Sequence, residues 1–243
     1  MKLKMLFCGG ENYKMQIDQL NQSDARLSLR AVAALEIISV ISSVLITAWV
    51  LNPLQLNQRW IEAVPGILAL ALMIYSHWLH GETPQVLGFT LQHFWRALRL
   101  IILPMIVVGA LLILIGYQAH SLNFGERFWL SLLVVPFWGL TQQYILQGFI
   151  YRRLKRIFPA QNSYIIILMA AVLFALVHVP NLPLMFLTLV GGIVWTWVYA
   201  RAPNLFVLGL SHGVMSAIAM SSLPAWFLQS MSIGYKHLLF QKF

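Results

Sequence analysis

Residues 141–149 read Thr141-Gln142-Gln143-Tyr144-Ile145-Leu146-Gln147-Gly148-Phe149, and three amide side chains in this stretch interrupt an otherwise apolar run. An amide that is buried in hydrocarbon without a hydrogen-bond partner costs roughly 2–7 kcal/mol. Gln142, Gln143 and Gln147 are therefore expected to face a protein interior or a polar cavity. We interpret the stretch as the rim of a site around which the rest of the chain is organised.

The composition around this stretch is typical of a membrane protein. Hydrophobic residues make up 60% of the 243 residues, charged residues make up 9%, and the mean hydropathy is +0.76. Soluble domains carry charges at about a quarter of their positions. The sequence predicts an all-α fold, a polytopic integral membrane helix bundle with about seven transmembrane helices of ~20 residues. The expected spans are residues 31–51, 61–79, 100–116, 128–150, 164–179, 184–200 and 205–223.

The formal net charge of +9 is explained by membrane topology rather than by nucleic acid. With the amino terminus in the cytoplasm, twelve of the sixteen Lys and Arg residues fall on that side, including the block Arg152, Arg153, Lys155 and Arg156. Cytoplasmic loops carry such an excess of basic residues. We expect the lipid bilayer as a partner, no nucleic acid, and a location in the cell (plasma) membrane with a cytoplasmic amino terminus.

Three segments are expected along the chain. Residues 1–30 have no signal-peptide pattern and are predicted to form a cytoplasmic amino-terminal segment. Residues 31–223 are predicted to form the transmembrane helical domain, in which the mixed segment 81–99 favours a helix lying in the membrane interface. Residues 224–243 are expected to be a carboxy-terminal tail or interfacial segment.

Polar residues near the ends of the first two spans are expected at the interface. Glu36 lies about one turn from the basic end of its span, from which its side chain can reach the headgroups. His77 and His80 can share a helix face beside Trp78, at a boundary where aromatic residues are common, so we predict no metal site there. Cys8 is the only cysteine, which excludes a disulfide framework within the chain.

Two later spans carry small residues at every fourth position. Such a spacing gives one helix face that allows a neighbouring helix to approach closely. The residues concerned are Thr188, Gly192, Thr196 and Ala200 in one span, and Gly209, Gly213 and Ala217 in the next.

Two histidines lie deep within the later spans. With a helical rise of ~1.5 Å per residue, His178 is expected ~21 Å, Gln142 ~15 Å and His212 ~14 Å from the cytoplasmic boundary. An ionisable residue at such a depth indicates a function, and a histidine that donates to a backbone carbonyl is the structural alternative. Ser216 follows His212 by one turn, and its hydroxyl either joins the site or bonds its own helix backbone.

The chemistry of these spans is limited, since no Asp or Glu follows Glu126. Two histidines without a third charged or thiolate ligand make a poor zinc site, and we predict neither a metal nor a cofactor. Ser211 adjoins His212, but neighbours in a helix point about 100° apart, so they are poorly placed as nucleophile and base.

Three patterns occur in order on successive spans: the stretch from Gln142 to Gly148, Phe174 with His178, and His212 with Ser216. They resemble the Glu-Glu-x-x-x-Arg-Gly, Phe-x-x-x-His and His-x-x-x-Asn motifs of the CAAX-protease and bacteriocin-processing family of intramembrane proteins (CAAX prenyl protease-like, type II). The resemblance covers roughly residues 125–220.

The resemblance implies an intramembrane endopeptidase of the glutamate type that cleaves a hydrophobic or prenylated peptide or protein. On that pattern His178 would activate a water and His212 would steady the oxyanion. A glutamate can take a proton from water, whereas the carboxamide that replaces it here can only accept a hydrogen bond. The catalytic positions are occupied by Gln142, Gln143, His178, His212 and Ser216, and the supporting positions by Gln147 and Phe174.

The replaced carboxylates leave three functions open. The first is a working peptidase in which neutral His178 is the base and Gln142 orients the water. The second is a pseudoprotease that binds a peptide or a membrane protein partner without cutting it, in an immunity or maturation role. The third is a transporter or proton relay that uses the histidines as carriers.

Overall fold

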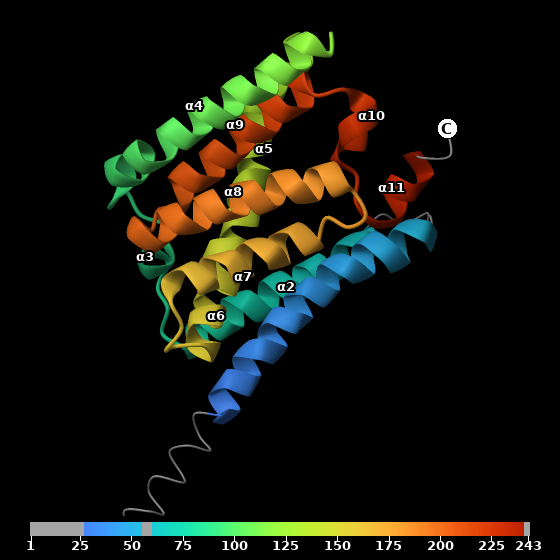
Figure 1. Cartoon of the computed structure of the whole chain (residues 1–243). Coiled ribbons are helices and arrows are strands. Elements are labelled where there is room, and N and C mark those ends of the chain that lie inside the picture. Colours follow the sequence, from blue (N-terminus) through green and yellow to red (C-terminus); the bar gives the residue numbers. More distant parts are fainter. Residues whose placement is uncertain (1–26, 55–59, 241–243) are drawn as a thin grey trace, which may run out of the picture.

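The computed structural model describes residues 27–54 and 60–240, and the regular structure in this part of the chain is helical throughout. Figure 1 shows α4, α9, α8 and α7 side by side, with α5 crossing behind them. The long elements are the helix Leu27–Leu54, α2 (Trp60–Leu79), α4 (Phe94–Gln118), α5 (Glu126–Gln143), α7 (Ser163–Leu176), α8 (Leu182–Arg201) and α9 (Leu205–Ser222). The short elements are η1 (Thr47–Leu51), η2 (Asn52–Leu54), α3 (Pro84–Leu87), η3 (Tyr144–Tyr151), α6 (Arg152–Ile157), α10 (Ala225–Leu228), η4 (Gln229–Met231) and α11 (Gly234–Phe240).

The predicted all-α fold is confirmed, but the predicted count of seven transmembrane helices is not. Among the described residues, five helices are long and apolar enough to cross a membrane: Leu27–Leu54, α2, α4, α8 and α9. The other two expected spans, 128–150 and 164–179, coincide with α5 and α7, which are not among these five helices. α7 has only 14 residues, and α5 carries polar residues at both of its ends.

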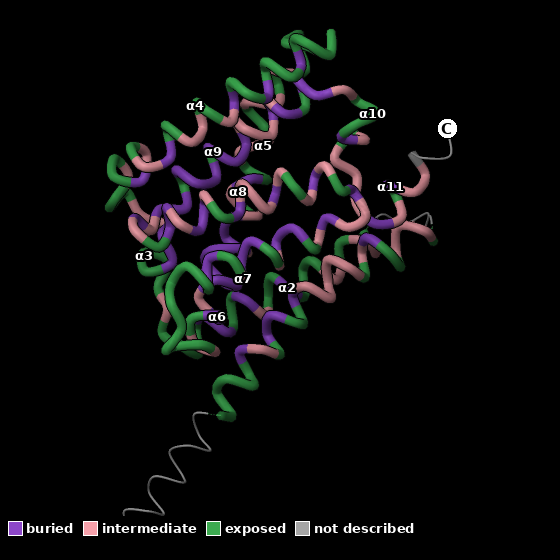
Figure 2. The backbone as a smooth tube through the Cα atoms, viewed as in Figure 1, coloured by how far each residue is buried: buried purple, intermediate pink, exposed green. Residues whose placement is uncertain are grey.

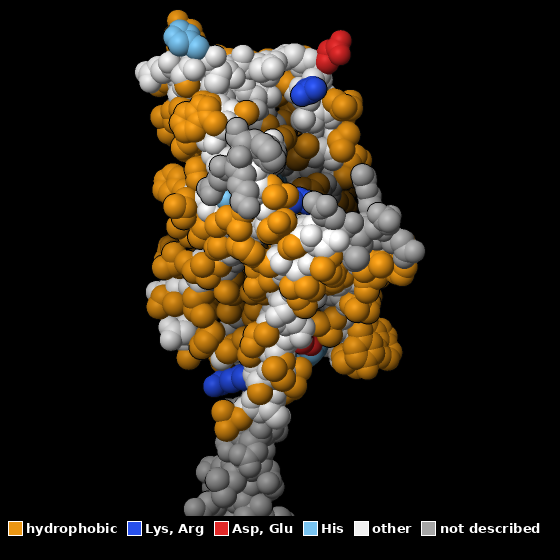
Figure 3. Space-filling view, turned by 90° about the vertical axis from the view of Figure 1, so that its right-hand side faces the viewer, with side chains coloured by type: hydrophobic (Ala, Val, Ile, Leu, Met, Phe, Trp, Pro, Cys, Tyr) orange, Lys and Arg blue, Asp and Glu red, His pale blue; other side chains and the backbone are white. Residues whose placement is uncertain are grey.

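The surface supports an integral membrane protein. Large apolar side chains are exposed along α4, where a soluble protein would carry polar ones. Figure 3, seen from the side where α10 and α11 lie, shows a surface that is mostly apolar. The exposed residues of α4 include Ile102, Leu103, Ile106, Val107, Leu111 and Leu114.

The centre of the bundle is built by the close approach of α5 and α9. A Cβ atom placed on Gly213 would lie 2.5 Å from Pro136 Cα, and one placed on Gly209 would lie 2.7 Å from Leu140 Cα. Real Cβ atoms do not approach so closely, so only glycine fits at these positions. The predicted small-residue face of this helix is thus confirmed at both glycines. The face predicted on α8 also packs closely, because Gly192 lies against Ala171 of α7.

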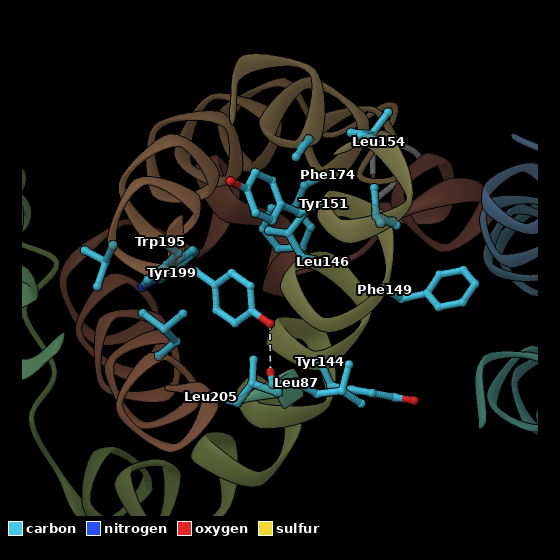
Figure 4. Packing of buried hydrophobic residues seen from close by; sticks show 14 of the residues in the cluster. Leu87, Tyr144, Leu146, Phe149, Tyr151, Leu154, Phe174, Trp195, Tyr199 and Leu205 are labelled. Carbon is cyan, nitrogen blue, oxygen red and sulfur yellow. Dashed lines mark hydrogen bonds between the residues drawn. The ribbon is translucent and has the colours of Figure 1, made fainter. Parts of the chain in front are cut away.

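Buried residues concentrate on η3 and on the facing sides of α7, α8 and α9, whereas much of α4 is exposed (Figure 2). η3 continues α5 as a π-helical segment directly after Gln143 and contains Gln147, and such segments are frequent at functional sites. A buried hydrogen bond ties the short α3 to this core, because the Tyr199 hydroxyl donates to the Leu87 carbonyl oxygen over 2.8 Å (Figure 4).

The prediction of one interfacial helix over residues 81–99 is wrong. α3 starts where the Thr83 side chain accepts a hydrogen bond from the Val86 amide, as an N-cap residue does. It ends four residues later at Gly88, whose φ of 101° is left-handed. α4 begins only at Phe94, so a capped turn and a loop replace the expected helix.

The carboxy-terminal segment folds back onto the loop between α7 and α8. The buried Asn181 amide donates to the carbonyl oxygens of Leu228 (2.9 Å) and Ser232 (3.1 Å). The Gly234 amide donates to the Val179 carbonyl oxygen over 2.9 Å. The helices α10 and α11 therefore cover the end of the bundle near this loop (Figure 1).

Candidate functional site

A chain of buried side chains crosses the centre of the bundle. Gln143 at the end of α5 and Gln147 in η3 are both fully buried. The Gln147 Nε2 atom donates to Gln143 Oε1 (3.3 Å) and to Thr196 Oγ1 of α8 (3.0 Å). The Gln143 Nε2 atom lies 3.0 Å from His212 Nδ1 of α9. The chain thus links three helices and the π-helical segment without any charged group.

The number of donors and acceptors on these side chains determines which atom donates in each hydrogen bond. In the arrangement above, Gln147 Oε1 is the one buried polar atom of Gln143, Gln147 and Thr196 that has no partner among the described residues. If both amide groups were turned by 180°, the two N–H groups of Gln147 would lie where its Oε1 atom now lies, and neither would have an acceptor among the described residues. Buried unpaired donors are rarer than under-satisfied carbonyl oxygens. Gln143 therefore donates to His212 Nδ1, and the proton of the neutral His212 ring lies on Nε2.

His212 is held in place by two aromatic rings. Trp195 of α8 stacks on its imidazole, with 4.4 Å between the ring centroids and 11° between the planes. Phe174 of α7 meets it edge-on at 6.0 Å. The Trp195 indole N–H in turn donates to Ser211 Oγ over 3.0 Å, and that hydroxyl donates to the Leu208 carbonyl oxygen. Ser211 therefore positions Trp195 rather than His212.

His178 has the opposite tautomer. α7 ends two residues before it, and its backbone amide bonds the Ala175 carbonyl oxygen. The Phe174 carbonyl oxygen therefore accepts from His178 Nδ1, at 2.6 Å. Since a carbonyl oxygen can only accept, Nδ1 carries the proton and Nε2 keeps its lone pair. The Phe174 ring also meets the His178 imidazole edge-on at 5.0 Å.

The site thus presents one imidazole lone pair and one imidazole N–H donor. His178 Nε2 can take a proton, and His212 Nε2 can donate a hydrogen bond. Neither atom has a hydrogen bond to a described residue. The Phe174 ring contacts both imidazoles. An imidazole lone pair is the kind of group that base catalysis uses, and an imidazole N–H is the kind that stabilises an oxyanion.

The structure joins five of the seven predicted site residues by hydrogen bonds or ring contacts: Gln143, Gln147, Phe174, His178 and His212. The other two, Gln142 and Ser216, are half-buried, and their side chains form no hydrogen bond with the described part of the chain. Within residues 27–54 and 60–240, no three His, Cys, Asp or Glu side chains are grouped so that they could hold a metal ion.

A second polar cluster was not predicted from the sequence. The fully buried Arg153 of α6 donates to Glu36 Oε2 (2.6 Å), Glu82 Oε2 (2.9 Å) and Ser76 Oγ (2.7 Å). Ser76 also donates to Glu36 Oε1 over 2.5 Å. The interfacial role predicted for Glu36 is wrong, because its carboxylate faces the interior and is paired. This cluster ties the first two long helices to α6.

The Glu82 carboxylate also interacts with His77, Arg152 and Arg156. It accepts from Arg152 at 2.6 Å, forms an ion pair with Arg156 at 3.1 Å, and lies 2.7 Å from His77 Nδ1. Burial alone would raise the pKa of the Glu82 carboxyl, but the hydrogen bonds from His77, Arg152 and Arg153 hold it well below its usual range. The interfacial role predicted for His77 is also wrong, since only 4% of this residue is exposed.

The sequence carried a weak signal for this cluster. A glutamate inside the first apolar run is unusual, and a buried charge there needs a partner. The basic block after the fourth run offers such partners, but taken alone it indicates topology, and the glutamate taken alone indicates a side chain that reaches the interface. Their pairing links residues 117 positions apart.

The family model of type II CAAX prenyl endopeptidase Rce1-like proteins matches residues 124–218. This range contains the three motif positions at Gln142–Gly148, Phe174–His178 and His212–Ser216. The resemblance seen in the motifs is thus confirmed for this part of the chain. No curated protein and no solved structure matches the chain.

Proposed function

We propose that this protein is an intramembrane endopeptidase in which His178 is the general base and His212 is the oxyanion donor. The observation that carries the proposal is the pair of hydrogen bonds at His212 Nδ1 and His178 Nδ1, from which we infer opposite protonation of the two rings. A hydrolytic site needs one group that takes a proton from water and another that donates to the developing oxyanion. The family match at residues 124–218 supports the same reaction class.

The reaction follows from these two atoms. His178 Nε2 takes a proton from a water, and the resulting hydroxide attacks the carbonyl carbon of the scissile peptide bond. The negative charge moves to the carbonyl oxygen, which accepts a hydrogen bond from His212 Nε2–H. The protonated His178 then gives its proton to the leaving nitrogen as the C–N bond breaks, which yields a carboxylic acid and an amine.

The surroundings favour a hydrophobic or lipidated peptide as the substrate. Phe174 and Trp195 border the imidazoles, and apolar side chains dominate the outer surface. A peptide with a prenyl or other apolar group would reach this site from the bilayer. We place the protein in the cell membrane, with the end that bears Arg152 and Arg153 in the cytoplasm, because basic residues favour that side.

A second candidate function is a pseudoprotease that binds such a peptide, or a membrane protein partner, without cleaving it. It is favoured by the amide groups at the positions of the family's two glutamates. The Gln143 amide is committed to His212 and Gln147, and an amide cannot accept a proton from water. Such a protein would act in immunity to a peptide or in its maturation.

Cleavage of a prenylated peptide by the purified protein, followed by mass spectrometry, separates the two functions. The peptidase predicts specific cleavage by the wild type. It also predicts a rate about 10²–10⁴-fold higher in Gln142→Glu, which adds a carboxylate base at a half-buried position. Gln142→Met, which adds none, is the matched control. Peptide binding without cleavage by the wild type, with cleavage gained in the Gln142→Glu/Gln143→Glu double variant, would establish the pseudoprotease instead.

A further inference from the structure

We infer that Gln147 is a positioning residue that fixes His212 as the Nε2–H tautomer, acting through Gln143. Neutral amides thus orient the proton of the hydrogen-bond donor in this site. The catalytic consequence of the tautomer rests on the proposed function, but the tautomer itself does not, so the two can fail separately.

Gln147 controls the orientation of the Gln143 amide. The two ends of an amide group have nearly the same shape, so packing alone does not distinguish them. The only described partners of the Gln143 amide are Gln147 and His212. His212 Nδ1 can act as donor or acceptor, and it imposes no orientation by itself. The N–H that Gln147 offers to Gln143 Oε1 therefore turns the Gln143 N–H toward His212.

The aromatic contacts of His212 fix the position of the ring but not its proton. The stacked Trp195 and the edge-on Phe174 contact carbon and nitrogen atoms of the imidazole without a directed hydrogen bond. Stacking of this kind is the same for either neutral tautomer. The position of the proton is then set by the hydrogen bond to Nδ1 alone, and this bond depends on Gln147.

Burial makes this control effective. Gln143, Gln147 and Thr196 are all fully buried, and an unpaired buried donor carries a large desolvation cost. Gln147 donates to Thr196 Oγ1 over 3.0 Å, which uses its second N–H. The Thr196 hydroxyl can donate or accept, so it does not by itself fix the orientation of the Gln147 amide. The chain from Thr196 to His212 thus behaves as one series of neutral hydrogen bonds.

The test is ¹⁵N NMR of the full-length protein with labelled histidines, in nanodiscs at a mildly alkaline pH where the imidazoles are neutral. Protonated and unprotonated ring nitrogens have well-separated ¹⁵N shifts, and the His212→Ala variant assigns the signals. The wild type is expected to show His212 with Nε2 protonated and Nδ1 unprotonated. In Gln147→Met, which keeps the volume but removes the donor, the single tautomer should be lost and an Nδ1–H population should appear.

Thr196→Val is the matched control, because it disturbs the same buried chain but leaves the Gln147 donor to Gln143 in place. It should keep the Nε2–H tautomer. A wild type with Nδ1 protonated, a Gln147→Met variant with an unchanged tautomer, or an equal change in both variants would overturn the inference. Gln143→Glu, an acceptor without N–H groups, provides the reference spectrum for a protonated Nδ1. Peptide cleavage does not enter any of these readouts.

Discussion

Gln143 of α5 and His212 of α9 are joined by a buried hydrogen bond of 3.0 Å between Nε2 and Nδ1. The bond spans 69 positions of sequence and lies where the two helices are in close contact through Gly209 and Gly213. It connects the first and the third family-like motif directly. Two of the three amides that interrupt the apolar sequence, Gln143 and Gln147, therefore form a hydrogen-bonded series that ends at this histidine.

Replacing Gln143 by methionine is expected to destabilise the protein by about 1–3 kcal/mol, because His212 Nδ1 and one Gln147 N–H lose their buried partner. The free energy of unfolding in detergent measures the loss. Gln142→Met is the control on the adjacent residue, and its change should stay within about 0.5 kcal/mol because Gln142 has no hydrogen bond to the described residues. Equal losses of stability in the two variants would contradict a stabilising role of the Gln143 hydrogen bonds.

A single methyl group added at the contact between α5 and α9 is expected to destabilise the protein. In Gly213→Ala the new Cβ would lie 2.5 Å from Pro136 Cα, so the helices must separate, and overpacking of this kind costs typically about 1–3 kcal/mol. Gly66→Ala in α2 is the control, since nothing lies within 4 Å of its Cβ position. Thermal unfolding should show a lower midpoint for Gly213→Ala and an unchanged or higher midpoint for Gly66→Ala.

Arg153→Met is expected to cost about 3–5 kcal/mol, because it leaves the Glu36 carboxylate buried without its ion-pair partner. The double variant Glu36→Gln/Arg153→Met removes that unpaired charge and should recover part of the loss. Lys155→Met is the control on the same helix, where the side chain is exposed. Denaturant unfolding of the wild type, Glu36→Gln, Arg153→Met, the double variant and Lys155→Met tests this, and additive effects of the two substitutions would contradict the coupling.

Stability is expected to fall in acid through Glu82. The pKa of its carboxyl is lowered in the folded state, so its contribution is complete above the unfolded pKa of about 4.3 and is lost as the pH falls toward the folded value. The difference in unfolding free energy between the wild type and Glu82→Gln should therefore shrink below about pH 5. A difference that stays constant across this range would contradict the assigned ion pairs.

The parts of the fold that depend on local spacing could be predicted from the sequence. Gly209 and Gly213 are four residues apart, and this spacing alone places them on one face of α9. Phe174 and His178 follow the same rule at the end of α7. The proximity of Phe174 to His212 is expected from the resemblance to the family, in which the three motifs occur in the same order on separate helices.

The contacts that depend on helix phase and on distant partners could not be predicted. Gln142 and Gln143 are equally polar, and only the rotation of α5 against α9 determines that Gln143 faces His212. The π-helical segment after Gln143 changes the phase of the residues that follow. The pairing of Glu36 with Arg153 depends on the packing of the first helix against α6, which no local pattern encodes.

The most direct test of the proposed chemistry compares the wild type with His178→Ala in the cleavage of a prenylated peptide in nanodiscs. The wild type should cut one peptide bond and release an acid and an amine, because His178 Nε2 can take the proton of the attacking water. Removal of this base should lower kcat/KM by about 10²–10⁴-fold, while the variant still binds the peptide. An equal rate in folded His178→Ala, or no cleavage of bound peptide by the wild type, would contradict the account.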